Sequence, residues 1–208
     1  MLIDALHDVP AFGIVPAAHL LAALAGAYPA DAVFFAVVDP GVGGRRGALV
    51  LELGDQHFVG PDNGLFSILW QRARQRRCWR IAWRPERLSS SFHGRDLFAP
   101  VAAALAKARV PRGWVAAKAR PAVLLPAADL AQVIYIDHYG NAVTGLRFTH
   151  GKGTLRVGRR VLRYARTFEE AGGPFWYANS LGLVEIAAPR GSAARELGLT
   201  IGSAVKLD

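Results

Sequence analysis

The chain has 208 residues, of which 52% are hydrophobic and 20% are charged. This composition supplies enough apolar surface for one sizeable core or two modest cores, and it excludes an intrinsically disordered polymer. The formal net charge of +9 at pH 7 permits nonspecific attraction to nucleic acids, but charge alone defines neither a fold nor a function.

The first half of the chain alternates between helical and strand patterns. An alanine- and leucine-rich stretch at 17–28, after Pro16, predicts a helix. The apolar run at 32–38 predicts a buried strand, and residues 48–53 and 56–59 predict two more strands on either side of a Gly54-Asp55 turn. A helix at 65–77, a strand at 79–83 and a helix at 97–108 follow. This alternation favours an α/β domain with a mostly parallel sheet.

The second half has a different pattern. After Pro121, short strands separated by glycines are predicted at 132–136, 155–157, 160–164 and 182–186. They favour a small all-β, barrel-like domain. The stretch at 114–129, rich in alanine and interrupted by two prolines, is the predicted linker. We therefore expect two domains, residues 1–120 and residues 121–208.

Cysteine usage and hydropathy bear on the compartment. The single cysteine, Cys78, excludes an internal disulfide and is typical of a reducing environment. The longest apolar stretch, residues 20–38, is interrupted by Tyr28-Pro29-Ala30-Asp31, and so falls short of the ~20 residues of a membrane-spanning helix. No basic leader precedes an apolar segment. We expect a cytoplasmic protein with no membrane partner.

Arginines are concentrated after the apolar stretch at 65–70. This cluster predicts a solvated helix face, because no aromatic RNA-binding signature and no helix-turn-helix pattern accompanies it. A nucleic-acid partner is therefore not expected, although a basic nucleic-acid-binding protein remains the weakest of three alternatives. The cluster consists of Arg72, Arg74, Arg76, Arg77, Arg80, Arg84 and Arg87.

The most informative loop follows the strand at 32–38. It reads Val38-Asp39-Pro40-Gly41-Val42-Gly43-Gly44-Arg45-Arg46-Gly47. A strand that leads into such a loop places Asp39 at the carboxyl edge of a sheet, where open α/β folds bind ligands. The glycines permit close backbone approach, and Arg46 can fold back towards the Asp39 carboxylate. The Gly-Lys-Ser/Thr ending of a phosphate-binding P-loop is absent, so nucleotide phosphates are not expected here.

Other polar loops have structural explanations when taken singly. Pro61-Asp62-Asn63-Gly64 is a good turn sequence, and His93 or Asp96 could cap or pack against a helix. Together, however, Asp39, Asp62 and His93 all lie where strands give way to loops. An aspartate, an arginine and a histidine at one sheet edge could orient a water molecule, stabilise hydroxide and manage a proton. Neither metal-ligand spacing nor a Gly-x-Ser-x-Gly nucleophile elbow occurs.

In this order, these motifs resemble the S-adenosyl-L-methionine hydroxide adenosyltransferase family, relatives of the bacterial fluorinase and chlorinase. The resemblance continues beyond the linker and implies an α/β domain followed by a β-barrel domain, assembled as a homotrimer with active sites between subunits. It implies S-adenosyl-L-methionine as substrate and no cofactor. The carboxyl-terminal matches are Ile136-Asp137, Tyr139-Gly140-Asn141, Thr144, Asn179-Ser180, Gly182, Glu185-Ile186-Ala187, Gly191 and Ala193-Ala194.

The resemblance also implies residue roles. The family's water-activating trio falls on Asp39, Arg46 and His93, and water or hydroxide would attack C5′ of the ribose to give adenosine and methionine. Halide-using relatives typically carry tyrosine in place of His93 and lack the arginine, which favours water as nucleophile. The implied substrate contacts are Asp62 and Asn63 in the nucleoside pocket, Asp137 at the methionine amino group, Ser180 and Leu181 at its carboxylate, Asn141 at the adenine edge and Phe168 stacking.

The resemblance has one large departure. The family opens with a further strand and helix, which include a Thr-Asp-Phe-Gly segment whose aspartate binds the ribose hydroxyls. This sequence opens on Met1-Leu2-Ile3-Asp4, which resembles the segment after it. Two expectations follow, a start further upstream or a shortened member with weakened or lost catalysis. The main alternative to a hydrolase is therefore a non-catalytic binder of S-adenosyl-L-methionine or adenosine with an incomplete pocket.

Overall fold

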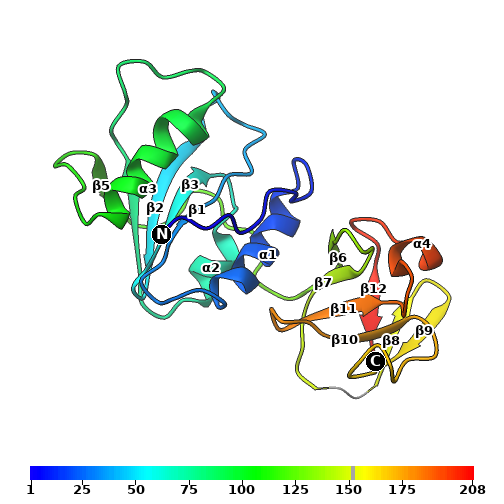
Figure 1. Cartoon of the computed structure of the whole chain (residues 1–208). Helices are drawn as coiled ribbons and strands as arrows, with labels where there is room; N and C mark the ends of the chain where they lie inside the picture. The colour runs from blue at the N-terminus through cyan, green and yellow to red at the C-terminus, as the bar shows by residue number, and fades with distance from the viewer. Residues whose placement is uncertain (151–152) are drawn as a thin grey trace. The chain divides into compact units, whose positions relative to one another are not determined.

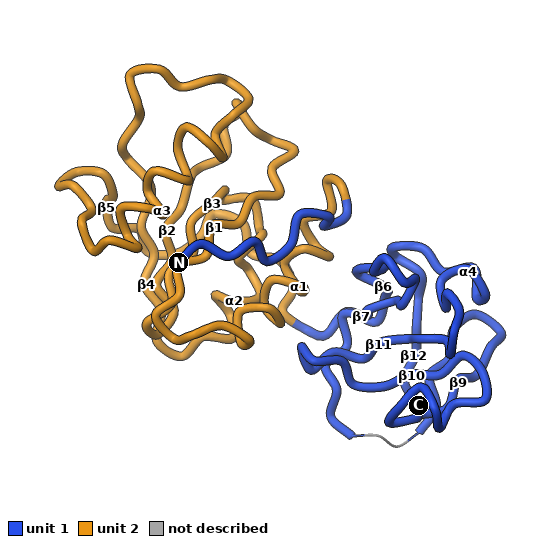
Figure 2. The backbone as a smooth tube through the Cα atoms, viewed as in Figure 1, with its two compact units in different colours: residues 1–10, 128–208 blue, residues 11–127 orange. Residues whose placement is uncertain are grey.

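A computed structural model of the chain describes residues 1–150 and 153–208 (Figure 1). Its contacts divide it into two compact units (Figure 2). The amino-terminal unit is Ala11–Ala127, and the carboxyl-terminal unit is Ala128–Asp208 together with Met1–Pro10. Residues 121–127 therefore group with the amino-terminal unit, and the first ten residues group with the carboxyl-terminal unit.

The amino-terminal unit is built on a five-stranded sheet with the order β1-β3-β2-β4-β5. Three α-helices and one π-helical turn, η1, accompany the sheet (Figure 1). In chain order the elements are α1 (Ile14–Ala25), β1 (Val33–Phe35), β2 (Gly47–Leu53), β3 (Gln56–Asp62), α2 (Ser67–Arg72), β4 (Arg76–Ile81), η1 (Gly94–Phe98), α3 (Ala99–Ala106) and β5 (Val115–Lys118).

This sheet is mixed, so the predicted mostly parallel sheet is wrong. Only β1 and β3 pair in parallel, whereas β2 pairs antiparallel with β3 and β4, and β4 pairs antiparallel with β5. The cause is local, because the two-residue Gly54-Asp55 turn, with Gly54 at φ 61°, can only close an antiparallel hairpin. The predicted helix at 65–77 is also shorter than expected. It ends at Arg72, and the chain is already extended at Ala73.

The sheet brings three chain segments to one edge. Because β1 and β3 run in parallel, their carboxyl ends lie at the same edge. Gly47 pairs with Asp62, so the amino end of the antiparallel β2 lies there too. The loop from β1 to β2 and the loop after β3 therefore meet. Leu97, Phe98 and Val101 belong to the same buried cluster as sheet residues, which anchors η1 and α3 on the sheet.

The carboxyl-terminal unit consists mostly of antiparallel strands, in the orders β10-β11-β7-β6 and β12-β8-β9. Isolated bridges Gln132–Ala204 and Tyr164–Trp176 connect the two sheets at both edges. Trp176, Leu155 and Ile186 are fully buried between them. The elements are β6 (Leu130–Ile136), β7 (Ala142–Arg147), β8 (Thr154–Val157), β9 (Arg160–Arg163), β10 (Phe175–Ala178), β11 (Leu183–Ala187), the short helix α4 (Ala193–Leu197) and β12 (Val205–Leu207).

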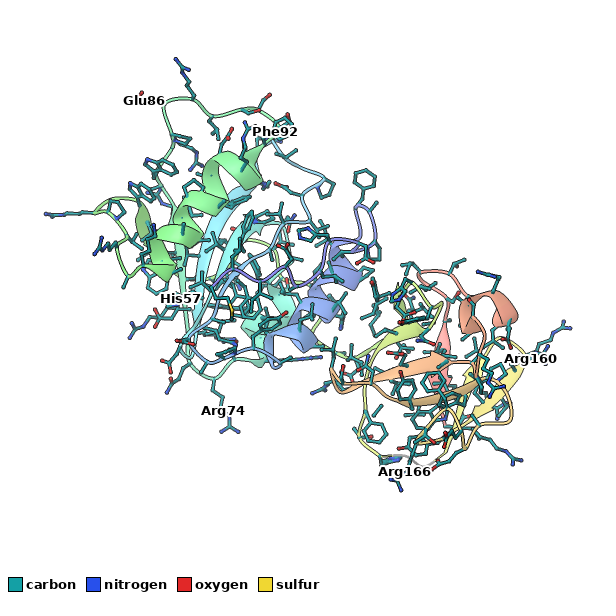
Figure 3. The ribbon with its side chains drawn as sticks, in the orientation of Figure 1. His57, Arg74, Glu86, Phe92, Arg160 and Arg166 are labelled. Carbon is teal, nitrogen blue, oxygen red and sulfur yellow. The ribbon has the colours of Figure 1, made fainter. Side chains whose placement is uncertain are left out.

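The arginine cluster is solvated, but it does not form a helix face. Its members between 72 and 87 are all exposed and are spread over the end of α2, strand β4 and the loops beside them. The side chain of Arg74 extends outward from the ribbon, as do those of Arg160 and Arg166 (Figure 3). Among the described residues, no helix combines the length and the apolar character needed to cross a membrane.

Candidate active site

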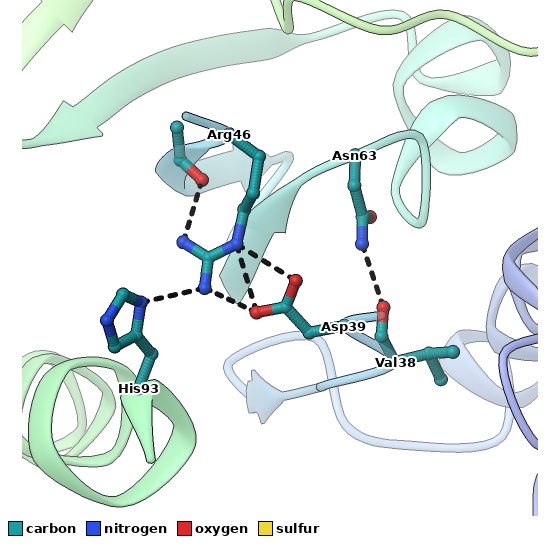
Figure 4. Close-up of polar contacts among 6 residues, drawn as sticks. Val38, Asp39, Arg46, Asn63 and His93 are labelled. Atoms are coloured by element: carbon teal, nitrogen blue, oxygen red, sulfur yellow. Dashed lines mark hydrogen bonds and ion pairs between the residues drawn. The ribbon is translucent and has the colours of Figure 1, made fainter. Parts of the chain in front are cut away.

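Asp39 and Arg46 form a salt bridge in the loop between β1 and β2. The Arg46 Nε donates to both carboxylate oxygens of Asp39 at 2.9 Å, and Nη2 donates to Oδ2 (Figure 4). Only 4% of the Asp39 side chain and 11% of the Arg46 side chain are exposed. A shielded, multiply bonded pair of this kind fixes the orientation of both groups.

His93, one residue before η1, joins this pair. Its Nδ1 lies 2.9 Å from Nη2 of Arg46 (Figure 4). Because a guanidinium only donates, Nδ1 must accept, and the neutral ring then carries its proton on Nε2. Burial, and next the charge of Arg46, lower the pKa of His93 below its ordinary value of 6.5. The ring is therefore neutral near pH 7, with an Nε2–H group available as donor.

The local sequence explains why these loops meet. Gly43 has φ 77°, and a Cβ atom there would lie 2.4 Å from the carbonyl oxygen of Ser90. Only glycine allows this approach, which holds the 39–46 loop against the segment that leads to His93. The guanidinium of Arg46 lies 5.1 Å from the ring centroid of Phe98, a fully buried residue of η1. This cation–π contact adds a third partner to the Arg46 guanidinium, beside Asp39 and His93.

Asn63 ties the loop after β3 to this cluster. Its Nδ2 donates to the carbonyl of Val38 at 2.8 Å (Figure 4), and its Oδ1 accepts from the backbone N–H of Leu65 at 3.2 Å. Val38 directly precedes Asp39, so Asn63 fixes the backbone from which the catalytic candidate extends. The side chain predicted to line a nucleoside pocket thus has a scaffolding role in this structure.

Asp62 makes different contacts. It is 4% exposed, Oδ1 accepts from the backbone N–H of Ala122 at 2.8 Å, and Oδ2 lies 3.2 Å from Nζ of Lys118. The described residues provide no contact between Asp62 and the trio Asp39, Arg46 and His93. Its carboxylate instead holds the segment that follows β5.

Asp137 and Asn141 are brought together in the turn between β6 and β7. The Asp137 Oδ1 accepts from the backbone N–H groups of Tyr139 at 3.0 Å and Asn141 at 2.8 Å, and Oδ2 accepts from Nδ2 of Asn141 at 2.9 Å. Gly140 has φ 88°, and a Cβ atom there would overlap Oγ of Ser192 at 2.0 Å. The Asp–x–x–Gly–Asn pattern is therefore also the sequence that this turn requires.

Three further candidates lie at a hairpin end and on the surface. Ser180, which is exposed, and Leu181, which is half-buried, occupy the turn between β10 and β11. Phe168 is 42% exposed and packs edge-on against Phe175 and Tyr177, with centroids 5.2 and 5.9 Å away. An exposed aromatic ring supported from below by other rings is available for stacking.

Sequence reasoning gave no role to Glu185, which is 6% exposed in β11. Its Oε1 accepts from the Tyr177 hydroxyl at 2.6 Å, and its Oε2 accepts from Nδ2 of Asn179 at 3.0 Å. Burial raises the pKa of Glu185 above its ordinary value, more than the two hydrogen bonds lower it. The available signal was one glutamate inside the apolar run Leu183-Val184-Glu185-Ile186-Ala187.

The trio offers a defined chemistry. A buried carboxylate, a guanidinium and a neutral imidazole can orient a water molecule and receive its proton without a metal ion. Within residues 1–150 and 153–208, no three histidine, cysteine, aspartate or glutamate side chains are grouped so as to hold a metal.

Residues 1–113 match the sequence model of the SAM hydroxide adenosyltransferase N-terminal domain, and residues 131–206 match that of the C-terminal domain.

Individual relatives agree with these matches. The chain is 38% identical to the (R)-S-adenosyl-L-methionine hydrolase of Thermus thermophilus over 99% of this chain and 87% of that protein. It is 38% identical to the Salinispora arenicola hydrolase of the same name, over 99% and 85% respectively. Among solved structures, a conserved Thermotoga maritima protein superposes with a TM-score of 0.86 at 29% identity, covering 99% of this chain and 88% of that one. The chain belongs to the S-adenosyl-L-methionine hydroxide adenosyltransferase family.

Proposed function

We infer that this protein hydrolyses S-adenosyl-L-methionine to adenosine and L-methionine. The names of its relatives support this reaction. The observation that carries the proposal is the mutual contact of Asp39, Arg46 and His93, since it unites the three groups that would activate water. The sulfonium of the substrate is already a good leaving group, so neither a metal nor a cofactor is required.

The task of the site is then to position the nucleophile. The oxygen of water forms a bond to C5′, the bond from C5′ to sulfur breaks, and its electron pair remains on the sulfur of methionine. The proton released by water goes to the trio or to solvent. Holding water in line with C5′ and opposite sulfur supplies most of the acceleration.

The geometry suggests how the trio divides this work. Nε2–H of His93 donates to the water oxygen, while a remaining lone pair of Asp39 accepts a water hydrogen and then the proton. Arg46 fixes the positions of Asp39 and His93 relative to each other. A halide ion has no hydrogen to donate and would be repelled by the Asp39 carboxylate, so this arrangement favours water.

Other residues would bind the substrate. Asp137 would contact the methionine ammonium, Asn141 the adenine edge and Phe168 the adenine face, with Ser180 and Leu181 at the methionine carboxylate. Asp62 and Asn63 would shape the nucleoside pocket through the segments that they hold. Each of these assignments rests on the family resemblance together with the exposure and contacts described above.

The family resemblance also supports a homotrimer with sites between neighbouring subunits. Light scattering during gel filtration would then give three times the chain mass of 22.4 kDa. The single cysteine, buried and unpaired, is compatible with a cytoplasmic enzyme.

The decisive experiment is hydrolysis in ¹⁸O-labelled water. We expect adenosine that carries the label at its 5′-oxygen, and methionine without label, as measured by mass spectrometry. Replacement of Arg46 or His93 by alanine should suppress this product. Binding of S-adenosyl-L-methionine without turnover would instead favour the non-catalytic binder, and 5′-halogenated nucleoside formed in chloride or fluoride would contradict the preference for water.

A further inference from the structure

The buried Glu185 lies at the base of a hairpin. In the register of β10 and β11 it is directly opposite Tyr177, and Ala178 is opposite Val184. Directly opposed side chains on one face of an antiparallel pair contact each other, as the 2.6 Å hydrogen bond from the Tyr177 hydroxyl shows. A carboxyl group that is 6% exposed inside a β-unit requires partners, and here both of its oxygens have one.

The second partner, Asn179, controls the conformation of the turn. Its Nδ2 donates to Glu185, while its Oδ1 accepts from the backbone N–H groups of Leu181 at 3.0 Å and Leu183 at 2.9 Å. The backbone closes the same turn, because Gly182 N–H donates to the Asn179 carbonyl at 3.0 Å and Gly182 has φ 72°. The Asn179 amide is thus held by Glu185 on one side and holds the turn on the other.

The turn presents its middle residues outward. Ser180 is exposed and Leu181 is half-buried, and the described hydrogen bonds include none made by the Ser180 hydroxyl. Asp137 contributes to the electrostatic environment of Glu185, where it adds to the effect of burial in raising the pKa of that carboxyl group. Asp137 and Glu185 therefore lie within electrostatic range of each other in the same unit.

We propose that Glu185 is a positioning residue that acts through Asn179 to fix the turn that binds the amino-acid part of the substrate. This inference rests on the proposed function. It assigns a role to a residue outside the predicted contacts, and it predicts an effect on KM with little effect on kcat. The chemistry at C5′ depends on Asp39, Arg46 and His93, which Glu185 does not contact.

The chain offers matched variants for the test. Glu185→Ala removes both hydrogen bonds. Glu185→Gln can keep them, because its amide oxygen accepts from Asn179 and its amide nitrogen donates to the Tyr177 oxygen. Tyr177→Phe removes the other hydrogen bond of the same carboxyl group but leaves Asn179 held, and it retains the aromatic ring.

Steady-state adenosine formation would be measured for the full-length protein with each change. Loss of the Asn179 contact should raise KM for S-adenosyl-L-methionine roughly tenfold, with kcat within about twofold of wild type. Glu185→Gln should restore KM to within about threefold, and Tyr177→Phe should leave it unchanged. If circular dichroism shows that Glu185→Ala does not fold, Asn179→Asp removes the same contact from the other side, keeps an acceptor for Leu181 and Leu183, and should give the same KM effect.

The possible failures are distinguishable. An unchanged KM in the variants that lose the contact, or an equal rise in Tyr177→Phe, would overturn the positioning role while leaving the hydrolase intact. A wild-type protein that neither binds nor hydrolyses S-adenosyl-L-methionine would overturn the proposed function, and the role of Glu185 with it.

Discussion

Replacing Arg46 with lysine would remove the shape of the guanidinium while keeping its positive charge. In the structure, Arg46 bonds through Nε and Nη2 to Asp39, and through Nη2 to His93. A lysine ammonium can keep one ion pair with Asp39, but it cannot span the carboxylate and the imidazole together. The variant thus loses the His93 contact and one contact to Asp39. Charge-assisted hydrogen bonds contribute about 1.5–3 kcal/mol each, so at the lower end of this range the loss of two contacts raises the barrier by about 3 kcal/mol.

This corresponds to a fall in kcat on the order of 10²-fold, with KM nearly unchanged, because the lost contacts are within the trio. Initial rates of adenosine release, measured by chromatography over a range of substrate concentrations, would separate kcat from KM. Arg45→Lys is the matched control, since Arg45 is the exposed neighbour in the same loop and should retain wild-type kinetics. A wild-type kcat in Arg46→Lys would refute the view that the bridging geometry of the guanidinium, beyond its charge, aligns the trio.

Three further predictions follow from the same contacts. Asn63→Ala should lower the free energy of unfolding by about 1–3 kcal/mol in urea titrations and reduce kcat, whereas Asn63→Asp, which keeps the acceptor for Leu65, should be intermediate in stability. The pKa of His93 is lowered, so kcat should persist at pH 6.5 and fall only as pH drops through the lower folded-state pKa, whereas the stability contributed by the neutral ring is full only above the unfolded-state value of 6.5 and is lost between 6.5 and the folded-state pKa; a fall in kcat already above pH 6.5 would contradict this. Burial, followed by Asp62, raises the pKa of Cys78 to about 11, so iodoacetamide at pH 8 should alkylate it only after unfolding, as intact mass would show.

Local sequence patterns predicted most of the helices and strands, but they did not predict the direction in which the strands of the amino-terminal sheet pair. The strands at 132–136, 155–157, 160–164 and 182–186 correspond to β6, β8, β9 and β11. In the amino-terminal half, helix–strand alternation outweighed the Gly54-Asp55 turn, although that turn already required an antiparallel hairpin. The boundary between α2 and β4 was misplaced because the arginine-rich sequence suits either a solvated helix or a solvated strand face.

Some contacts of the candidate site could likewise be predicted from the sequence, and others depend on how the strands pair. The positions of Asp39, Asp62 and His93 where strands give way to loops predicted a shared sheet edge, with Arg46 folding back towards Asp39. The structure brings Asp39, Arg46 and His93 into contact, whereas Asp62 contacts Ala122 and Lys118. The contacts of Asp62 were not predictable, because Lys118 lies 56 residues away and the pairing depends on the antiparallel β4 and β5. The network of Glu185 likewise depends on strand register, which a single sequence does not specify when the strand is buried on both faces.

The charge balance of the trio connects its geometry to the proposed substrate. Asp39 and Arg46 cancel, and the low pKa of His93 keeps its ring neutral, so the trio carries no net charge near pH 7. S-adenosyl-L-methionine brings a positive sulfonium close to the reacting carbon. A protonated His93 would place a positive charge there and would also direct an Nδ1–H group against the donor Nη2 of Arg46. The guanidinium that orients the imidazole thus also suppresses its protonation, which suits a site for a cationic substrate and an uncharged nucleophile.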